Sequence, residues 1–329
     1  MRNSIYVLED KLVLKTKEEE LESETLAADA VLAQTLITAV SPGTELAAYQ
    51  GLPPLRPGKV YPRVVGYCNV ARVLRTGADV GGFAAGDIIL TFNSHRRYFI
   101  SKASDIICKL DPDEDLKHAV TAYLYHLAYV ALLESGARAG MKVAILGGGT
   151  LGYNACQLAA AMGLQVTLFS GQNYLAAELE EAGIGFFDKT GDAAAHAGAF
   201  DIVVSTSNAW NDWFLALQLL RYRGTLACLG FPGRGQEAPD TNPLDSRWFY
   251  DKQLTIKSVG YVYEGDIAAH DIRFNLRRNM AYLLDLIRKK RINPASIISK
   301  EVDATQLEEL YQYLSDRGSR RFTGLLLWQ

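Results

Sequence analysis

A glycine-rich segment in the middle of the chain constrains the fold more than any other feature. The apolar run Lys142–Leu146 is followed at once by Gly147, Gly149 and Gly152, with the spacing G-x-G-x-x-G. In a strand–turn–helix unit the first glycine permits a tight turn, the second lets the backbone approach a pyrophosphate, and the third lets helix and strand pack closely. The amino end of the helix adds N–H groups and the positive end of its dipole. The segment therefore predicts a dinucleotide site.

The sequence around this turn alternates between apolar runs and helical patterns. Runs typical of strands cover 142–147, 165–170, 201–206, 225–230 and 254–260, and helical patterns cover 151–162, 174–182 and 212–220. Strands separated by helices predict a doubly wound α/β fold with a parallel sheet. The alternative is a glycine-rich turn that binds nothing, and the regular succession of strands and helices argues against it.

The end of the second strand decides which nicotinamide dinucleotide is preferred. A carboxylate there accepts the ribose 2′-hydroxyl of NAD, but this strand ends in Ser170, Gly171, Gln172 and Asn173. The repulsion that excludes a 2′-phosphate is therefore missing, and Ser170, Gln172 and Asn173 can donate hydrogen bonds to it. No Arg or Lys lies in this loop, although a phosphate usually pairs with one. We expect NADP(H), with NAD as the alternative and the cation supplied from elsewhere in the fold.

The regions on either side of this unit have a different character. Residues 1–115 consist of short runs rich in β-branched and aromatic residues between glycine and proline turns, which predicts a β-rich, barrel-like domain. Residues 116–287 begin with a helical pattern and form the nucleotide-binding domain. Residues 288–329 mix strand and helix patterns, after an amphipathic helix expected from Asn275 to about Lys290. We expect this tail to return to the first domain.

Composition excludes several classes of function. The chain of 329 residues has 34 basic and 37 acidic side chains, so a nucleic-acid or anionic-membrane partner is not expected. Its four cysteines and five histidines form no sequence-local zinc motif. The weakly polar stretch 119–133 is shorter than the roughly 20 residues that a membrane span needs, and the amino terminus lacks the apolar core of a signal peptide. We therefore expect a cytoplasmic protein.

Four segments resemble the medium-chain dehydrogenase/reductase superfamily, and together they cover nearly the whole chain. They are 40–45 with 49–51, 62–66 with 86–87, 147–152, and 200–204 with 223–230. The resemblance implies a GroES-like β-barrel catalytic domain beside a Rossmann domain, and a homodimer joined through the strand at 254–260. Segments 41–45 and 275–280 are most similar to the subgroup of bacteriochlorophyllide dehydrogenase-like proteins. The cofactor residues implied are Gly147, Gly149, Thr150, Leu151, Gly152, Ser170, Gln172, Asn173, Ser205 and Gly230.

The positions that hold catalytic zinc in zinc-dependent members carry poor ligands in this chain. The resemblance places them at Ser41 or Pro42, at Tyr67 and at about Tyr123. Catalytic zinc is held by three nitrogen, sulfur or carboxylate donors, and a neutral tyrosine is not one of them. We therefore expect a zinc-independent member with no bound metal. A rival interpretation is a zinc-dependent alcohol dehydrogenase with other ligands, namely Cys68 with His95 or His118.

Without a metal, a side chain must polarise the reacting oxygen and supply a proton. Tyr67 and Tyr123 occupy the vacated positions and are the candidates, with aromatic packing as the alternative. His126 lies one helical turn from Tyr123, where it could relay protons or simply fill the core, and Ser41 and Thr44 could bind substrate or only form a turn. The expected function is hydride transfer between a nicotinamide and a carbonyl, alcohol or activated double bond of a small organic substrate. A non-catalytic NADPH-binding sensor or structural protein is the second rival.

Overall fold

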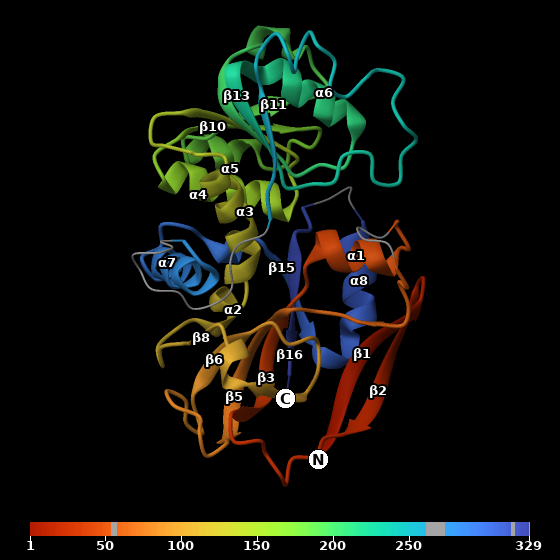
Figure 1. Ribbon diagram of the computed structural model, residues 1–329, viewed down its shortest axis with the longest axis vertical. Coiled ribbons are helices and arrows are strands. Elements are labelled where there is room, and N and C mark those ends of the chain that lie inside the picture. Colours follow the sequence, from red (N-terminus) through yellow and green to blue (C-terminus); the bar gives the residue numbers. More distant parts are fainter. Residues whose placement is uncertain (54–57, 261–273, 317–319, 329) are drawn as a thin grey trace. The chain divides into compact units, whose positions relative to one another are not determined.

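The computed structural model describes residues 1–53, 58–260, 274–316 and 320–328 (Figure 1). The chain forms two compact units, Met1–Tyr123 with Tyr263–Gln329, called unit 1, and Leu124–Val262, called unit 2. The domain boundaries expected after residues 115 and 287 stay a prediction. None of the described helices is long and apolar enough to cross a membrane.

Unit 2 is built on a parallel sheet of six strands. They are β9 (Lys142–Leu146), β10 (Gln165–Ser170), β11 (Gly185–Asp188), β12 (Phe200–Ser205), β13 (Leu220–Cys228) and β14 (Thr255–Ser258). Their order is β11-β10-β9-β12-β13-β14, and each neighbouring pair runs parallel. The central strands are almost continuously buried, as expected for a sheet covered by helices. This order confirms the doubly wound α/β fold.

The helices of unit 2 also follow the sequence patterns, with small differences at their ends. They are α3 (Ala122–Glu134), which begins in unit 1, α4 (Thr150–Ala161), α5 (Ala176–Glu181) and α6 (Trp210–Leu219). Strand β11 was not expected from the sequence, because it has only four residues and only two of them, Phe186 and Phe187, are apolar. It pairs with β10 at the outer edge of the described sheet.

Unit 1 consists mainly of antiparallel sheets. A three-stranded sheet has the order β2-β1-β4, and a seven-stranded sheet has the order β15-β16-β3-β5-β6-β8 with β7 paired to β3. The strands are β1 (Arg2–Asp10), β2 (Val13–Glu20), β3 (Ala30–Ala39), β4 (Arg63–Val64), β5 (Cys68–Thr76), β6 (Ile88–Thr91), β7 (Tyr98–Lys102), β8 (Cys108–Lys109), β15 (Ile298–Asp303) and β16 (Thr323–Leu327). The helices are α1 (Pro42–Tyr49), α2 (Leu116–Ala119), α7 (Leu276–Arg288) and α8 (Leu307–Ser315).

The C-terminal tail completes unit 1. Strand β16 pairs antiparallel with β3 and parallel with β15, and α8 packs against α1. A core containing Leu46, Tyr311 and Leu326 joins the two ends of the chain. The tail thus packs within unit 1, while the domain division expected from the sequence stays a prediction.

Helix α7 is amphipathic and begins where the sequence predicted. The side chain of Asn275 caps it by accepting a hydrogen bond from the backbone N–H of Arg278 at 3.0 Å. This helix groups with unit 1, whereas the sequence pattern had attached residues up to 287 to the nucleotide-binding domain. Contacts explain the difference, since Arg288 donates to Asp111 at 3.0 Å and to Glu114 at 3.1 Å.

Candidate functional site

The turn between β9 and α4 requires glycine at two positions for steric reasons. Gly147 has a φ of +103°, and a Cβ there would lie 2.6 Å from Oγ1 of Thr206. A Cβ on Gly152 would lie only 1.8 Å from the carbonyl oxygen of Gly147. Both positions therefore exclude a larger residue, as the spacing of the motif predicted.

Gly149 lacks a side chain for a different reason. A Cβ added to this residue would meet no atom within 4 Å, so the space in front of it is open. Gly149 is also the N-cap of α4, and no side chain caps the helix from that position. An open space at an uncapped helix terminus suits a pyrophosphate, which would accept hydrogen bonds from the first turn, where Thr150 and Leu151 lie. The residues present fit a dinucleotide.

The end of β10 lies directly against the glycine turn. A Cβ on Gly148 would be 2.6 Å from Oγ of Ser170, and this hydroxyl accepts a hydrogen bond from the backbone N–H of Gln172 at 3.1 Å. Ser170 is buried, whereas Asn173 is exposed. The side-chain oxygen of Gln172 accepts a hydrogen bond from Tyr174. Of the three predicted ribose-binding residues, Ser170 thus faces the turn and Asn173 faces solvent.

Ser205 and Gly230 hold the ends of two neighbouring strands. The carbonyl oxygen of Ser205, the last residue of β12, accepts hydrogen bonds from the N–H groups of Leu229 at 2.9 Å and Gly230 at 2.8 Å. A Cβ on Gly230 would lie 2.3 Å from the carbonyl oxygen of Ser207. These residues therefore shape the carboxyl edge of the sheet, where ligands bind in folds of this type.

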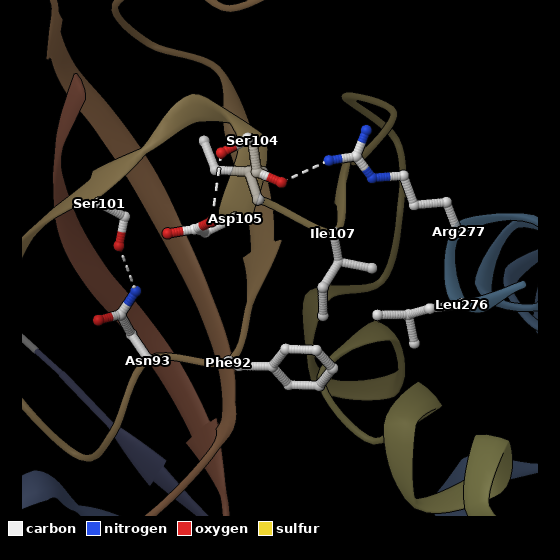
Figure 2. Close-up of a pocket in the computed structure, with 9 residues that line it drawn as sticks. Phe92, Asn93, Ser101, Ser104, Asp105, Ile107, Leu276 and Arg277 are labelled. Atoms are coloured by element: carbon white, nitrogen blue, oxygen red, sulfur yellow. Dashed lines mark hydrogen bonds between the residues drawn. The ribbon is translucent and has the colours of Figure 1, made fainter. Parts of the chain in front are cut away.

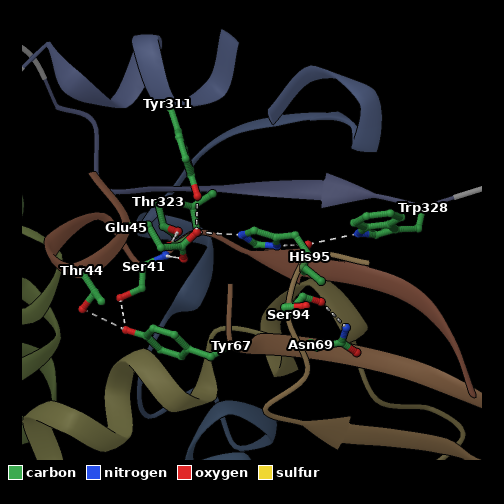
Figure 3. A network of polar contacts seen from close by, with 12 residues as sticks. Ser41, Thr44, Glu45, Tyr67, Asn69, Ser94, His95, Tyr311, Thr323 and Trp328 are labelled. Carbon is green, nitrogen blue, oxygen red and sulfur yellow. Dashed lines mark hydrogen bonds and ion pairs between the residues drawn. The ribbon is translucent and has the colours of Figure 1, made fainter. Parts of the chain in front are cut away.

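In unit 1 the structure brings together four of the predicted catalytic residues. The hydroxyl of Tyr67 donates a hydrogen bond to Oγ of Ser41, and Oγ1 of Thr44 lies 3.4 Å from the same phenol oxygen (Figure 3). The ring of Tyr123 meets the ring of Tyr67 edge-on, with centroids 5.7 Å apart, and packs against Phe92 at 4.6 Å. We call Ser41, Thr44, Tyr67 and Tyr123 the hydroxyl cluster. The start of α1, the residue before β5 and the start of α3 thus bring these side chains together.

Burial changes the acidity of the central tyrosine. Desolvation is the largest influence and raises the pKa of Tyr67 well above its usual value near 10, while the hydrogen bonds to Ser41 and Thr44 act in the opposite direction. The phenol therefore keeps its proton throughout the physiological pH range. A protonated phenol beside two rotating hydroxyl groups can donate a hydrogen bond or a proton to an oxygen that becomes negative.

A buried network of hydrogen bonds around Glu45 holds the backbone of the hydroxyl cluster at Ser41. Oε2 of Glu45 lies 2.8 Å from Nε2 of His95 and accepts a hydrogen bond from the hydroxyl of Tyr311 at 2.6 Å, while Oε1 accepts one from the backbone N–H of Ser41 at 2.6 Å. Nδ1 of His95 lies 2.8 Å from Oγ1 of Thr38. Figure 3 shows Glu45 at the centre of these contacts. Nothing in the sequence indicated this arrangement, because its members are up to 266 residues apart.

The same contacts bear on whether zinc could be held here. Pro42 has no donor atom, Tyr67 keeps its proton, and both ring nitrogens of His95 already have partners at 2.8 Å. Burial raises the pKa of the Cys68 thiol well above its usual value, which opposes the thiolate that a metal needs. Within the described ranges no group of three or more His, Cys, Asp or Glu side chains could hold a metal ion. The donor set does not fit zinc in either proposed arrangement.

His126 belongs to unit 2, although it is on the same helix as Tyr123. It is 1% exposed, and desolvation lowers its pKa to about 4. The imidazole is therefore uncharged near neutral pH and has no excess proton to donate there.

Unit 1 contains a pocket of about 510 Å³, and Figure 2 shows the residues that line it. Phe92, whose ring contacts Tyr123, forms part of its wall, so the pocket and the cluster share this residue. Arg277 donates to the carbonyl oxygen of Ser104 at 2.6 Å, and Asn93 donates to Ser101 at 2.9 Å. The lining is therefore polar on several sides and apolar at Phe92, and the sequence patterns did not indicate it.

Comparisons with known proteins agree with this geometry. The family model described as zinc-binding dehydrogenase matches residues 150–274. The chain is 37% identical over 128 residues to the probable formaldehyde dehydrogenase AdhA of Bacillus subtilis (strain 168), covering 38% of this chain and 36% of that protein. It is 33% identical over 153 residues to NADP-dependent alcohol dehydrogenase C 1 of Mycolicibacterium smegmatis, covering 44% of this chain and 43% of that protein. These matches thus span less than half the length of the curated relatives.

The similarity of structure extends over the whole chain. The crystal structure of 2R,3R-butanediol dehydrogenase from Bacillus subtilis matches with a TM-score of 0.81, over 99% of both chains, at 16% sequence identity. The fold and the glycine turn define a protein with a Rossmann nucleotide-binding domain and a GroES-like domain. The sequence matches, each to part of a dehydrogenase, and this likeness of fold agree with the resemblance to the medium-chain dehydrogenase/reductase superfamily.

Proposed function

We propose that this protein is a zinc-independent, NAD(P)H-dependent oxidoreductase that acts on a carbonyl, alcohol or activated double bond of a small organic substrate. The observation that carries the proposal is the turn between β9 and α4, where Gly149 leaves an open space in front of an uncapped helix terminus. The named activities of the relatives support the same reaction class.

The chain's own residues divide the work between the two units. When bound, the dinucleotide supplies or accepts a hydride at its nicotinamide ring. The turn at Gly147–Gly152 positions its pyrophosphate. Tyr67, held by Ser41 and Thr44, supplies the proton to the substrate oxygen through its hydroxyl, with Tyr123 as the second candidate donor. The pocket that contains Phe92 and Arg277 offers space for the rest of the substrate.

Replacing Gly149 by valine is expected to weaken NADPH binding at least about tenfold, or about 1.4 kcal/mol. A Cβ at this position meets no protein atom within 4 Å, so the fold should remain. Binding is measured by NADPH fluorescence, and folding by thermal unfolding. Gly81→Val is the matched control, because a Cβ there also meets nothing within 4 Å. Unchanged NADPH affinity in the Gly149 variant would refute this site.

Zinc independence leads to a second expectation. The purified protein should contain far less than one zinc per chain, and chelation should leave turnover unchanged, because the donor set around Tyr67 and His95 does not suit the metal. The family-model match at 150–274 includes none of the positions discussed for zinc. Metal analysis by mass spectrometry tests this. One zinc per chain, with activity lost on its removal, would favour the zinc-dependent rival.

A non-catalytic NADPH-binding protein is the other rival, and a substrate panel separates the two. An enzyme should oxidise NADPH with at least one aldehyde, ketone or enone, whereas a sensor should bind NADPH and turn over none of them. The preference for NADP(H), the homodimer, the cytoplasmic location and the bacteriochlorophyllide dehydrogenase-like subgroup stay predictions.

A further inference from the structure

The loop after β10 contains no Arg or Lys, but a lysine follows directly after the neighbouring strand β11. Strand β11 pairs with β10 so that Asp188 lies opposite Ser170, and Lys189 follows directly. The backbone N–H of Lys189 donates to the carbonyl oxygen of Ser170 at 3.2 Å. The backbone of Lys189 therefore lies beside the end of β10, where the adenosine ribose binds in this fold.

The side chain of Lys189 then lies along Gly171. Its Cε is 3.7 Å from the position that a Cβ on Gly171 would occupy, and Cγ2 of Thr190 is 3.8 Å from the same point. A lysine that the loop after β10 does not itself contain thus lies beside Gly171. The end of this strand also abuts the glycine turn through Ser170 and Gly148.

A buried carboxylate fixes the ammonium group. Nζ of Lys189 lies 2.7 Å from both oxygens of Asp212, in the first turn of α6. The Asp212 side chain is 5% exposed, whereas that of Lys189 is 28% exposed. An ammonium group has three donors, and at most two of them serve Asp212. Lys189 thus keeps one donor and an accessible face while its position is held.

A second carboxylate at this edge is engaged by its own loop. Oδ1 of Asp188 accepts hydrogen bonds from the N–H of Thr190 at 2.9 Å and from its hydroxyl at 2.8 Å. Asp188 would otherwise suit the ribose 2′-hydroxyl of NAD and repel a phosphate. These two hydrogen bonds occupy Oδ1, and the charged side chain that lies beside Gly171 is that of Lys189.

The geometry points to Lys189 as the residue that binds the 2′-phosphate of NADP(H), with Asp212 as the positioning residue that holds it. This assignment rests on the proposed dinucleotide site and adds to it the source of specificity. The phosphate would receive a charge-assisted hydrogen bond from Nζ, and the hydroxyl of NAD would receive only a weaker neutral interaction.

Calorimetric titration with 2′,5′-ADP and with 5′-AMP tests the assignment without any turnover. The wild type should bind 2′,5′-ADP more tightly than 5′-AMP. The double variant Lys189→Gln/Asp212→Asn avoids an unpaired buried charge, and it should lose about tenfold or more in affinity for 2′,5′-ADP while 5′-AMP changes less than about twofold. Asp212→Asn alone should keep or increase the affinity for 2′,5′-ADP, because the amide oxygen still accepts a hydrogen bond from Nζ and holds it in place, while a negative charge near the phosphate is removed.

The double variant and Asp212→Asn alone thus have opposite expected effects on the affinity for 2′,5′-ADP. A pair that only stabilised the fold would not show this difference. Equal losses for both nucleotides, or the same loss in Asp212→Asn as in the double variant, would overturn the role of Lys189. A wild type that prefers 5′-AMP would overturn it too, while leaving the dinucleotide site in place. Binding of neither nucleotide by the wild type would instead overturn the proposed function, and this assignment with it.

Discussion

Replacing Tyr67 by phenylalanine is expected to lower turnover about 100-fold or more, the usual contribution of a positioned proton donor. The substitution removes one oxygen atom and keeps the ring that packs edge-on against Tyr123. Ser41 and Thr44 then have no phenol hydroxyl beside them that could donate to the substrate oxygen. The measurement is the rate of NADPH oxidation at saturating substrate, with NADPH binding determined in parallel to show that unit 2 is unaffected.

Tyr61→Phe is the matched control for this experiment. Its hydroxyl also makes a hydrogen bond within unit 1, to the carbonyl oxygen of Ala48, but it lies outside the hydroxyl cluster. Turnover of the control should remain within about twofold of the wild type. Tyr123→Phe distinguishes the two candidate donors, because only the true donor should show the large loss. Wild-type rates in both Tyr67→Phe and Tyr123→Phe would remove the tyrosines from the mechanism and leave them as packing residues.

Replacing Glu45 by alanine is expected to lower the free energy of unfolding by at least about 3 kcal/mol, because three buried partners lose their acceptor and each such loss costs about 1–3 kcal/mol. The carboxylate is 3% exposed and accepts hydrogen bonds from the backbone of Ser41 and from Tyr311, besides its contact with His95. All three partners would lose their acceptor in a place that water does not reach. Urea-induced unfolding followed by circular dichroism measures the change.

Asp29→Ala is the control for Glu45→Ala. Asp29 is paired with Lys102 at 4.0 Å, and both side chains are more than half exposed. Solvent screens such a pair, so its loss should change stability little. If the two variants lost the same stability, the Glu45 carboxylate would not be the organising group of the buried network. A protein with Glu45→Ala that fails to accumulate in folded form would agree with the expectation.

The nucleotide unit was predictable because its determinants are local. Gly147 and Gly152 are five residues apart, and the clashes that exclude other side chains involve the turn itself. Strand β11 escaped prediction, since its four residues carry neither an alternating nor a continuous apolar pattern. The sequence therefore did not identify Lys189 as a neighbour of β10 either, because Lys189 is placed there by β11.

The difference between local and long-range determinants also applies to the hydroxyl cluster and to Glu45 and His95 beside it. Resemblance to a family brought Ser41, Thr44, Tyr67 and Tyr123 to attention, and the structure places them in contact. Glu45 and His95 are 50 residues apart, and neither belongs to a local motif with the other. Their contact depends on how the strands and loops of unit 1 pack together. A short stretch of sequence does not contain this information.

The position of β16 between β3 and β15 has a consequence for the order of events during synthesis. Everything that unit 2 contains has left the ribosome once residue 262 is free, so the nucleotide fold can close while the chain is still growing. Unit 1 must wait, because Trp328 donates to Thr38 and Tyr311 to Glu45 across 290 and 266 residues. Until β16 has been synthesised, Ile37–Ala39 of β3 lack the strand that pairs with them, whereas Ala30–Gln34 can already pair with β7. The growing chain thus exposes this short piece of sheet edge after unit 2 is able to fold, and an open edge can pair with another chain.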